Sequence, residues 1–155
     1  MTIDQSVADY GEQLTNLDIR YKIAEHPELK AIKDVLDFLQ LKFSDCLPTL
    51  VMKADEEFIS VVFRGDCRVD FKKIKRDFNI KDLRLATQDE FTQLTHLPIG
   101  AARVYAPEVS KTLIDNKVLE SEILYGGSGV FNCSIGYFTS DLNKIPNSVF
   151  TDLTE

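Results

Sequence analysis

Few side chains in this sequence could act as acids, bases or nucleophiles, and they are widely spaced. The two histidines are His26 and His96. No serine, cysteine or aspartate is paired with His26 by a motif, so a polar residue at a strand end before Pro27 is favoured over a general base. His96 is expected at a helix end, where the helix dipole stabilises a cation.

The three cysteines, Cys46, Cys67 and Cys133, are odd in number and far apart. Without a Cys-x-x-Cys pair or a Cys/His cluster, the sequence indicates neither a zinc site nor a disulfide framework, and we expect no metal or cofactor. Reduced cysteines favour a cytoplasmic location. Cys67 lies among basic residues that could lower the pKa of its thiol, although a packing role is preferred.

Basic residues crowd one segment of an acidic chain. The net charge is −7, which argues against a general nucleic-acid coat protein because phosphate binding needs a positive surface. Aspartates are interleaved with the basic residues, so two interpretations stand: a solvated helix face, or a local patch that contacts phosphates. The basic residues are Arg64, Arg68, Lys72, Lys73, Lys75, Arg76, Lys81 and Arg84.

The elements that must position these residues fit one domain, expected over residues 1–155. Hydrophobic residues make up 44% and charged residues 28% of the chain, which is typical of a globular protein with a proper core. No apolar stretch approaches the roughly 20 residues that cross a bilayer, and the first residues lack the pattern of a secretory signal. We therefore expect no membrane contact.

Hydrophobic periodicity predicts a mixture of helices and strands. Residues 47–52 and 58–63 are β-branched and aromatic runs joined by an acidic turn, which predicts a hairpin. Hairpins together with helices predict an α+β fold with a curved, mixed and mainly antiparallel sheet and helices packed outside. Helices are expected over 3–14 (capped by Thr2), 29–39, 70–78 and 140–144, and after a capping box of Thr87 and Glu90. Further strands are expected over 17–24, 83–86, 104–106, 112–114, 123–125, 130–135 and 149–153.

Several segments follow the order of one known family. Residues 48–53 and 58–74 resemble the core of the YbaK/prolyl-tRNA synthetase editing-domain family, whose members remove wrongly attached amino acids from tRNA. The most specific element, Gly65-Asp66-Cys67-Arg68-Val69-Asp70-Phe71-Lys72-Lys73, is similar to the family's Gly-Asp-x-Arg-x-Asp-x-x-Lys. The resemblance runs from about Tyr21 to the C-terminus. Its other segments are 21–27, 83–87, 99–104, 114–115 and 126–127.

Two departures from the family pattern fall on functional positions. The family reads Lys-Thr-Leu or Lys-Asn-Leu where this chain has Pro48-Thr49-Leu50, and its Gly-x-x-x-Pro loop has Val104 at the proline. Lys53 is a poor substitute, because five residues along a strand reverse the face. Proline supplies no charge and no backbone N–H, and losing one donor of this kind costs about 3 kcal/mol in an oxyanion site.

The resemblance implies a free-standing protein that hydrolyses misacylated aminoacyl-tRNA, with tRNA and an aminoacyl-tRNA synthetase as partners. The alternative is a catalytically impaired pseudo-enzyme that binds tRNA, a synthetase or a small ligand. A purely structural interaction domain is a third interpretation. Pro48 and Val104 favour the second interpretation, whereas the intact Gly-Asp-x-Arg-x-Asp stretch is compatible with the first two.

The resemblance also implies where the site residues lie. The backbone donors that remain for catalysis are those of Gly100, Ala101 and Ala102. The cleft is expected to be bordered by these residues together with Pro48, Thr49 and Gly127, with His26 near its mouth. The phosphate contacts to tRNA are expected from Arg68, Lys72, Lys73 and Arg76.

Overall fold

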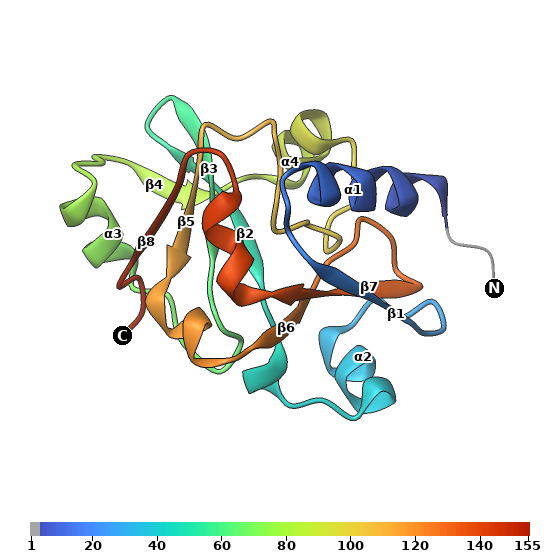
Figure 1. Cartoon of the computed structure of the whole chain (residues 1–155). Coiled ribbons are helices and arrows are strands. Elements are labelled where there is room, and N and C mark those ends of the chain that lie inside the picture. The colour runs from blue at the N-terminus through green and yellow to red at the C-terminus, as the bar shows by residue number, and fades with distance from the viewer. Residues whose placement is uncertain (1–3) are drawn as a thin grey trace.

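The computed structural model describes residues 4–155, which form an α+β domain with two sheets (Figure 1). The strands are β1 (Tyr21–Glu25), β2 (Thr49–Ala54), β3 (Glu57–Val62), β4 (Leu83–Leu85), β5 (Lys111–Asp115), β6 (Ile123–Gly126), β7 (Cys133–Phe138) and β8 (Ser148–Thr151). One sheet is antiparallel, in the order β1-β7-β6. The other has the order β4-β2-β3-β5-β8 and is antiparallel up to β3 and parallel beyond it. The predicted α+β class and mixed pairing are confirmed, with the strands divided between two sheets.

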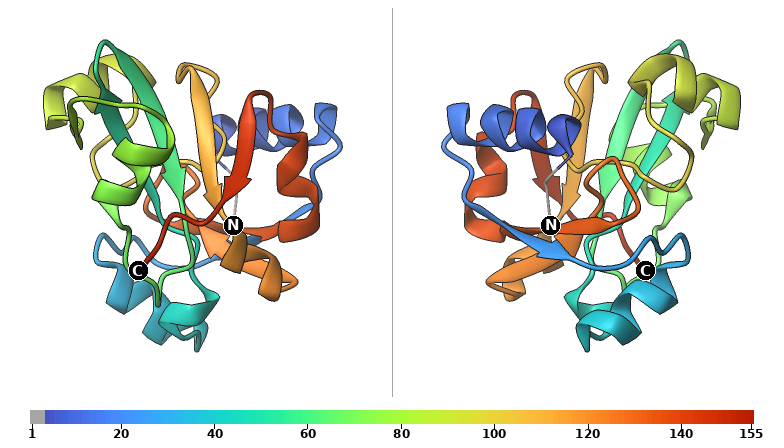
Figure 2. Two further views of the ribbon diagram at one scale, coloured as in Figure 1. Left: turned by 90° about the vertical axis from the view of Figure 1, so that its left-hand side faces the viewer. Right: turned by 90° about the vertical axis from the view of Figure 1, so that its right-hand side faces the viewer.

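Helices cover the outside of the sheets. In Figure 2, α3 and α4 lie towards one side of the molecule, and α1 and η3 lie towards the other. The helices are α1 (Gln5–Asn16), α2 (Ile32–Leu39), α3 (Phe71–Asp77) and α4 (Gln88–Thr95), with 3₁₀ helices η1 (Phe43–Asp45), η2 (Asn116–Glu120) and η3 (Thr139–Lys144). Within residues 4–155, no helix is both long enough and apolar enough to span a bilayer.

The predicted hairpin is formed by β2 and β3, which pair from Thr49 opposite Val62 to the tip. Asp55 turns the chain with a φ of 54°, a left-handed conformation that aspartate tolerates better than most residues. Its carboxylate also accepts hydrogen bonds from the N–H groups of Lys81 (3.3 Å) and Asp82 (2.9 Å). The turn residue therefore holds the hairpin tip against the entry to β4.

Two helices begin at side-chain caps, and one of them, the capping box of Thr87 and Glu90, is predicted from the sequence. The carboxylate of Asp70 accepts from the N–H of Lys73 (3.1 Å) at the start of α3. At α4, Thr87 Oγ1 accepts from the N–H of Glu90 (3.1 Å), and the Glu90 carboxylate accepts from the N–H of Thr87 (2.8 Å). These bonds satisfy N–H groups that have no partner within the helix.

Several predicted boundaries are wrong. Thr2, the expected cap of the first helix, lies outside the described residues, and Asp4 caps α1. The strand expected over 17–24 begins only at Tyr21, because Leu17 ends α1 and Asp18 has a φ of 60°. The strand expected over 130–135 begins at Cys133, after a turn that the Ser128 hydroxyl closes by donating to the Cys133 carbonyl (2.7 Å).

The strand expected over 104–106 is absent from the described chain. The isolated bridge in this region is made by the preceding residue, Arg103, with Gly127. Val104 is nevertheless completely buried, in the core between α1 and the antiparallel sheet. Its apolar character therefore reflects packing of an irregular segment rather than strand pairing.

The core has two parts, on opposite faces of the five-stranded sheet. Val62 and Ile114 face the larger cluster, which includes the buried side of α1. Val61 and Leu113 face the smaller cluster, which includes Ile74 of α3. Burial on both faces is typical of parallel strands and makes β3 and β5 the rigid centre from which the surrounding loops are held.

Candidate active site

One cavity of about 370 Å³ lies between α2, the start of β2, α4 and two loops. Its walls are mainly aliphatic and aromatic, as in sites for small organic ligands. All seven residues expected at the cleft contribute to its lining, although their functional roles remain predictions. They are His26, Pro48, Thr49, Gly100, Ala101, Ala102 and Gly127.

Two loops approach so closely at the cavity that only glycine fits. Arg103 bridges to Gly127, and a Cβ on Gly127 would overlap the carbonyl oxygen of Ala102. A Cβ on Gly126 would lie 2.8 Å from the carbonyl oxygen of Leu47. The glycine turn is therefore needed because backbone meets backbone here, and it joins the 100–103 loop to the chain entering β2.

A buried pair of tyrosines supports this wall from behind. The N–H of Tyr105 donates to the hydroxyl of Tyr10 (3.0 Å), the hydroxyls of Tyr10 and Tyr137 lie 2.8 Å apart, and Tyr137 donates to the carbonyl of Gly127 (3.1 Å). Burial raises the pKa of Tyr10 to about 12 and raises the pKa of Tyr137 well above its ordinary value. Both phenols stay neutral and can donate. Tyr10 and Tyr137 carry no local motif, and sequence analysis missed their pairing.

Two of the three expected backbone donors are free. The N–H of Ala101 already donates to the carbonyl of Pro98 (3.1 Å). Among the described residues, the N–H groups of Gly100 and Ala102 have no hydrogen-bond partner. Gly100 has a φ of 90°, a conformation that favours glycine. The loop thus leaves two N–H groups, rather than three, without a partner within the described chain.

Pro48 enters the cavity wall just before β2. Its carbonyl accepts from the N–H of Phe63 (3.3 Å), and as a proline it has no N–H to offer. The hydroxyl of the neighbouring Thr49 is buried without a hydrogen-bond partner within the described part of the chain. Lys53 does not line the cavity, and its ammonium lies 5.6 Å from the ring centre of Phe58.

His26 is buried in the wall, with 3% of its surface exposed, rather than standing at the mouth. Its Nδ1 lies 2.8 Å from the carbonyl oxygen of Pro27, and its Nε2 lies 3.0 Å from the hydroxyl of Ser134. Ser134 also lines the cavity. Sequence analysis found no partner for His26, because Ser134 is brought to it only by the pairing of β1 with β7, in which Ser134 lies opposite Ala24.

The cysteines are poor nucleophile candidates. Cys46 and Cys133 line the cavity, and burial raises the pKa of the Cys46 thiol to about 11 and raises that of Cys133. Partial burial and the neighbouring Asp66 carboxylate also raise the pKa of Cys67, and they outweigh the basic neighbours, which agrees with the preferred packing role. Within the described chain, no group of three or more histidine, cysteine, aspartate or glutamate residues could hold a metal ion.

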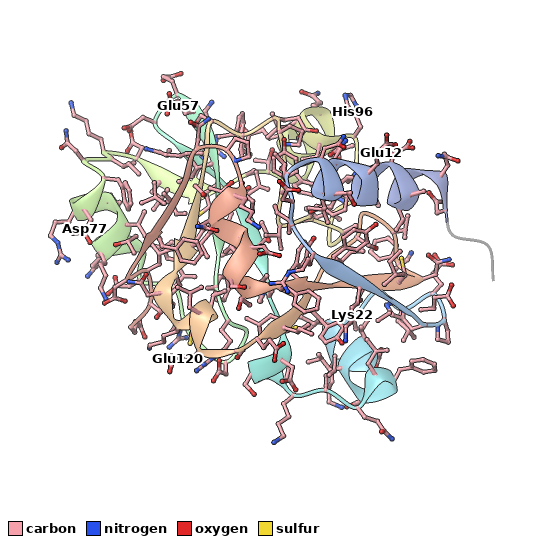
Figure 3. The ribbon with its side chains drawn as sticks, viewed as in Figure 1. Glu12, Lys22, Glu57, Asp77, His96 and Glu120 are labelled. Carbon is pink, nitrogen blue, oxygen red and sulfur yellow. The ribbon has the colours of Figure 1, made fainter. Side chains whose placement is uncertain are left out.

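None of the four predicted phosphate-contact residues lines the cavity. They belong to α3 and the loop before it, and Figure 3 places Asp77 of α3 and Lys22 of β1 on opposite sides of the molecule. Lys73 donates to the Asp152 carboxylate (3.0 Å) and to the carbonyl of Thr154 (2.7 Å). Arg76 pairs with Asp77 (3.0 Å). The remaining two, Arg68 and Lys72, are exposed.

The fold defines the class of protein. The structure is similar to that of a hypothetical protein, with a TM-score of 0.84 and 21% identity over 94% of this chain and 99% of the other. It is similar to that of a candidate trans-editing enzyme for prolyl tRNA synthetase, with a TM-score of 0.83 and 18% identity over 99% of each chain. These likenesses show a shared fold.

Sequence similarity gives the family. The proline–tRNA ligase of Bacillus velezensis is 32% identical over an alignment of 98 residues that covers 57% of this chain and 17% of the ligase. The ligase of Bacillus cytotoxicus is 36% identical over 75 residues, which are 48% of this chain and 13% of the ligase. This chain thus spans less than a fifth of these relatives. The aminoacyl-tRNA editing domain model matches residues 26–145, and the chain belongs to that family.

Proposed function

We propose that this domain hydrolyses the ester bond of misacylated aminoacyl-tRNA. The observation that supports this most is that one cavity joins the start of β2, the 100–102 loop and Gly127, which are the segments that the family resemblance assigns to the editing pocket. Its volume of about 370 Å³ falls in the size range of small-molecule sites, enough for an aminoacyl group and part of the nucleotide that carries it.

An aminoacyl ester is already reactive, so the protein must hold it, orient a water and stabilise the oxyanion that forms. The N–H groups of Gly100 and Ala102 are the free donors for that oxyanion. The substrate's own ribose hydroxyl assists the attacking water. Apolar walls exclude other water and strengthen these interactions. At position 48 no ammonium contributes, so we expect slow turnover.

The proposed partners follow from this reaction. We infer that aminoacyl-tRNA is the macromolecular substrate and that a synthetase supplies it. Prolyl-tRNA synthetase is the first candidate, because the matched relatives are proline–tRNA ligases. Both partners belong to translation, which places the proposed activity in the cytoplasm.

Release of labelled amino acid from a panel of mischarged tRNAs tests the proposal. Each tRNA is incubated with and without the protein, beginning with tRNA for proline that carries alanine. We expect release above the spontaneous rate for at least one member. Rates equal to the spontaneous rate across the whole panel would contradict hydrolysis.

A second candidate function is a binding module without catalysis. The observation that favours it is Pro48, which lines the cavity at the position where the family has lysine. This module would bind aminoacyl-tRNA with a measurable Kd and protect the ester from hydrolysis. Binding and turnover measured on the same tRNA therefore separate the two candidates.

A further inference from the structure

Ser134 and His26 form a polar pair in a cavity whose walls are otherwise mainly apolar. The N–H of His26 donates to the carbonyl of Asn132 (3.1 Å), which fixes the histidine beside the start of β7. The imidazole is almost completely buried, whereas Ser134 is half-buried and lines the cavity. Of the two side chains, Ser134 is the better placed to meet a ligand.

The hydrogen bonds of His26 determine which way the serine proton points. A carbonyl oxygen can only accept, so the contact with Pro27 at 2.8 Å assigns the imidazole proton to Nδ1. With that single proton on the ring, Nε2 is an acceptor, and the Ser134 hydroxyl donates to it across 3.0 Å. Having used its only proton, the Ser134 oxygen presents lone pairs alone to the cavity.

The other side-chain hydroxyls that line the cavity do not donate their proton within the described part of the protein. Among the described residues, neither the hydroxyl of Thr49 nor that of Tyr125 donates to a partner. The Tyr125 hydroxyl can therefore serve a ligand as a donor or as an acceptor, whereas the Thr49 hydroxyl is buried. Ser134 is the one side-chain hydroxyl lining the cavity, within the described chain, that must accept.

The charges around the cavity make an oxygen acceptor important. No aspartate or glutamate of the described chain lines the cavity, and Lys30 is its charged lining residue. An amino group that enters must therefore find neutral oxygens, or its N–H groups lose their hydrogen bonds to water without replacement. In an aminoacyl ester that amino group is attached to the carbon next to the ester carbonyl, so holding it also orients the carbonyl.

We propose that the Ser134 oxygen accepts a hydrogen bond from the α-amino group of the bound aminoacyl ester and thereby selects esters that carry a free amino group. Ser134 is a specificity-determining residue, and His26 is a positioning residue that acts through it. The inference rests on the proposed function for the identity of the ligand.

The test pairs one serine variant with two substrates. One is tRNA charged with an amino acid that the wild type hydrolyses, and the other is the same tRNA charged with the corresponding des-amino acid. Ser134→Ala should lower kcat/KM for the amino ester about three- to tenfold, as expected for one lost hydrogen bond, and change the des-amino ester by less than about twofold. Ser134→Thr keeps the hydroxyl and should behave like the wild type.

Ser60→Ala is the matched control, because the Ser60 hydroxyl is buried in β3 without a described partner and does not line the cavity. It should affect neither substrate. An equal loss on both substrates in Ser134→Ala would overturn the inference and assign the serine a structural role. A loss that depends instead on the terminal ribose hydroxyl, tested with 2′-deoxy tRNA, would overturn it too.

A binding measurement separates this inference from the proposed function. The probe is 3′-aminoacylamino-adenosine, in which an amide replaces the ester, compared with its des-amino counterpart by calorimetry. If the wild type hydrolyses neither ester, the proposed function is refuted. The Ser134 inference is then decided by the binding of the two adenosine probes alone. Support requires that Ser134→Ala weakens the amino form about three- to tenfold more than the des-amino form.

Discussion

At the scale of single residues, the consequences of Pro48 can be considered atom by atom. Its carbonyl bonds to Phe63, so a substitution there can keep the β2–β3 pairing. The nearest lysine along the strand, Lys53, lies outside the cavity lining. In the proposed reaction, the oxyanion therefore depends on the N–H groups of the 100–102 loop, two of which have no partner within the described chain.

We expect Pro48→Lys to raise the rate of deacylation, by up to about a hundredfold, because it adds an ammonium and an N–H near the developing charge. Single-turnover hydrolysis of a misacylated tRNA measures the change. Pro146→Lys, which adds the same charge at an exposed turn outside the cavity, should leave the rate unchanged. A folded Pro48→Lys protein that binds tRNA but stays inert would favour the binding module.

The tyrosine pair gives a second prediction at this scale. Tyr10→Phe leaves the N–H of Tyr105 without its acceptor and should lower the free energy of unfolding by about 1–3 kcal/mol. Tyr137→Phe should do the same by leaving the carbonyl of Gly127 unpaired. Because both belong to one chain of hydrogen bonds, the double variant should lose less than the sum.

Urea unfolding measures this cycle. Tyr105→Phe is the control, since the Tyr105 hydroxyl bonds to no residue of the described chain, and it should cost little. Strict additivity of Tyr10→Phe and Tyr137→Phe would mean that the two hydroxyls do not depend on one another.

At the scale of elements, the antiparallel sheet is held to η3 by Asp141. This buried carboxylate accepts from the Arg20 side chain (2.8 Å) and N–H (2.9 Å), just before β1, and from Lys144 (3.1 Å). Since β1 carries the chain into His26, this anchor also fixes one wall of the cavity. The hydrogen bonds from Arg20, more than any other interaction, hold the pKa of Asp141 well below its usual range.

The sign of the pH effect follows from this lowered pKa. Asp141 contributes stability that is fully present above its unfolded pKa, near 3.8, and is lost as the pH falls towards the lower folded value. Asp141→Asn should lower the free energy of unfolding by about 1–2 kcal/mol at pH 7. The loss stays this small because Arg20 is partly solvated. The difference in free energy of unfolding between the variant and the wild type should shrink below about pH 4, where protonation of the wild-type carboxylate removes its stabilising contribution.

Urea unfolding at pH 7, 5, 4 and 3 measures this dependence. Asp37→Asn removes a carboxylate from an exposed i,i+4 pair with Lys33 and should change stability little at any of these pH values. A difference between Asp141→Asn and the wild type that stayed constant down to pH 3 would contradict the proposed ionic anchor.

At the scale of the whole molecule, charge and cavity are separated. The chain has a net charge of −7, and its basic cluster lies on and around α3. Residues of α2 line the cavity, and α2 lies on the opposite side of the view in Figure 1 from α3. A tRNA is large enough to reach both places, so we retain α3 as the proposed phosphate contact. Lys73 is less available than expected, because it holds the C-terminal segment.

We therefore expect Arg68→Ala and Lys72→Ala each to weaken tRNA binding and to reduce the slope of log K against log salt by about one unit. Both side chains are exposed, so the fold should not change. Titrations between 50 and 200 mM salt, about a fourfold range, measure the slope. A reduced slope for Lys33→Ala on α2, with no change for the α3 variants, would move the contact to α2.

The sequence alone determined the elements whose signals are local. The β2–β3 hairpin and the Thr87–Glu90 capping box depend on residues within a few positions of one another, where side-chain alternation and capping geometry act directly. The resemblance placed seven residues that line one cavity, because the order of conserved segments survives where single signals are weak.

Only the tertiary structure decided which distant groups meet. His26 and Ser134 are 108 positions apart, and Tyr10 and Tyr137 are 127 apart. No periodicity links such pairs, because their contacts follow from which strands pair and in what register. The same reason explains Val104, whose apolar side chain fits a strand or a buried loop equally well until the core around it is assembled.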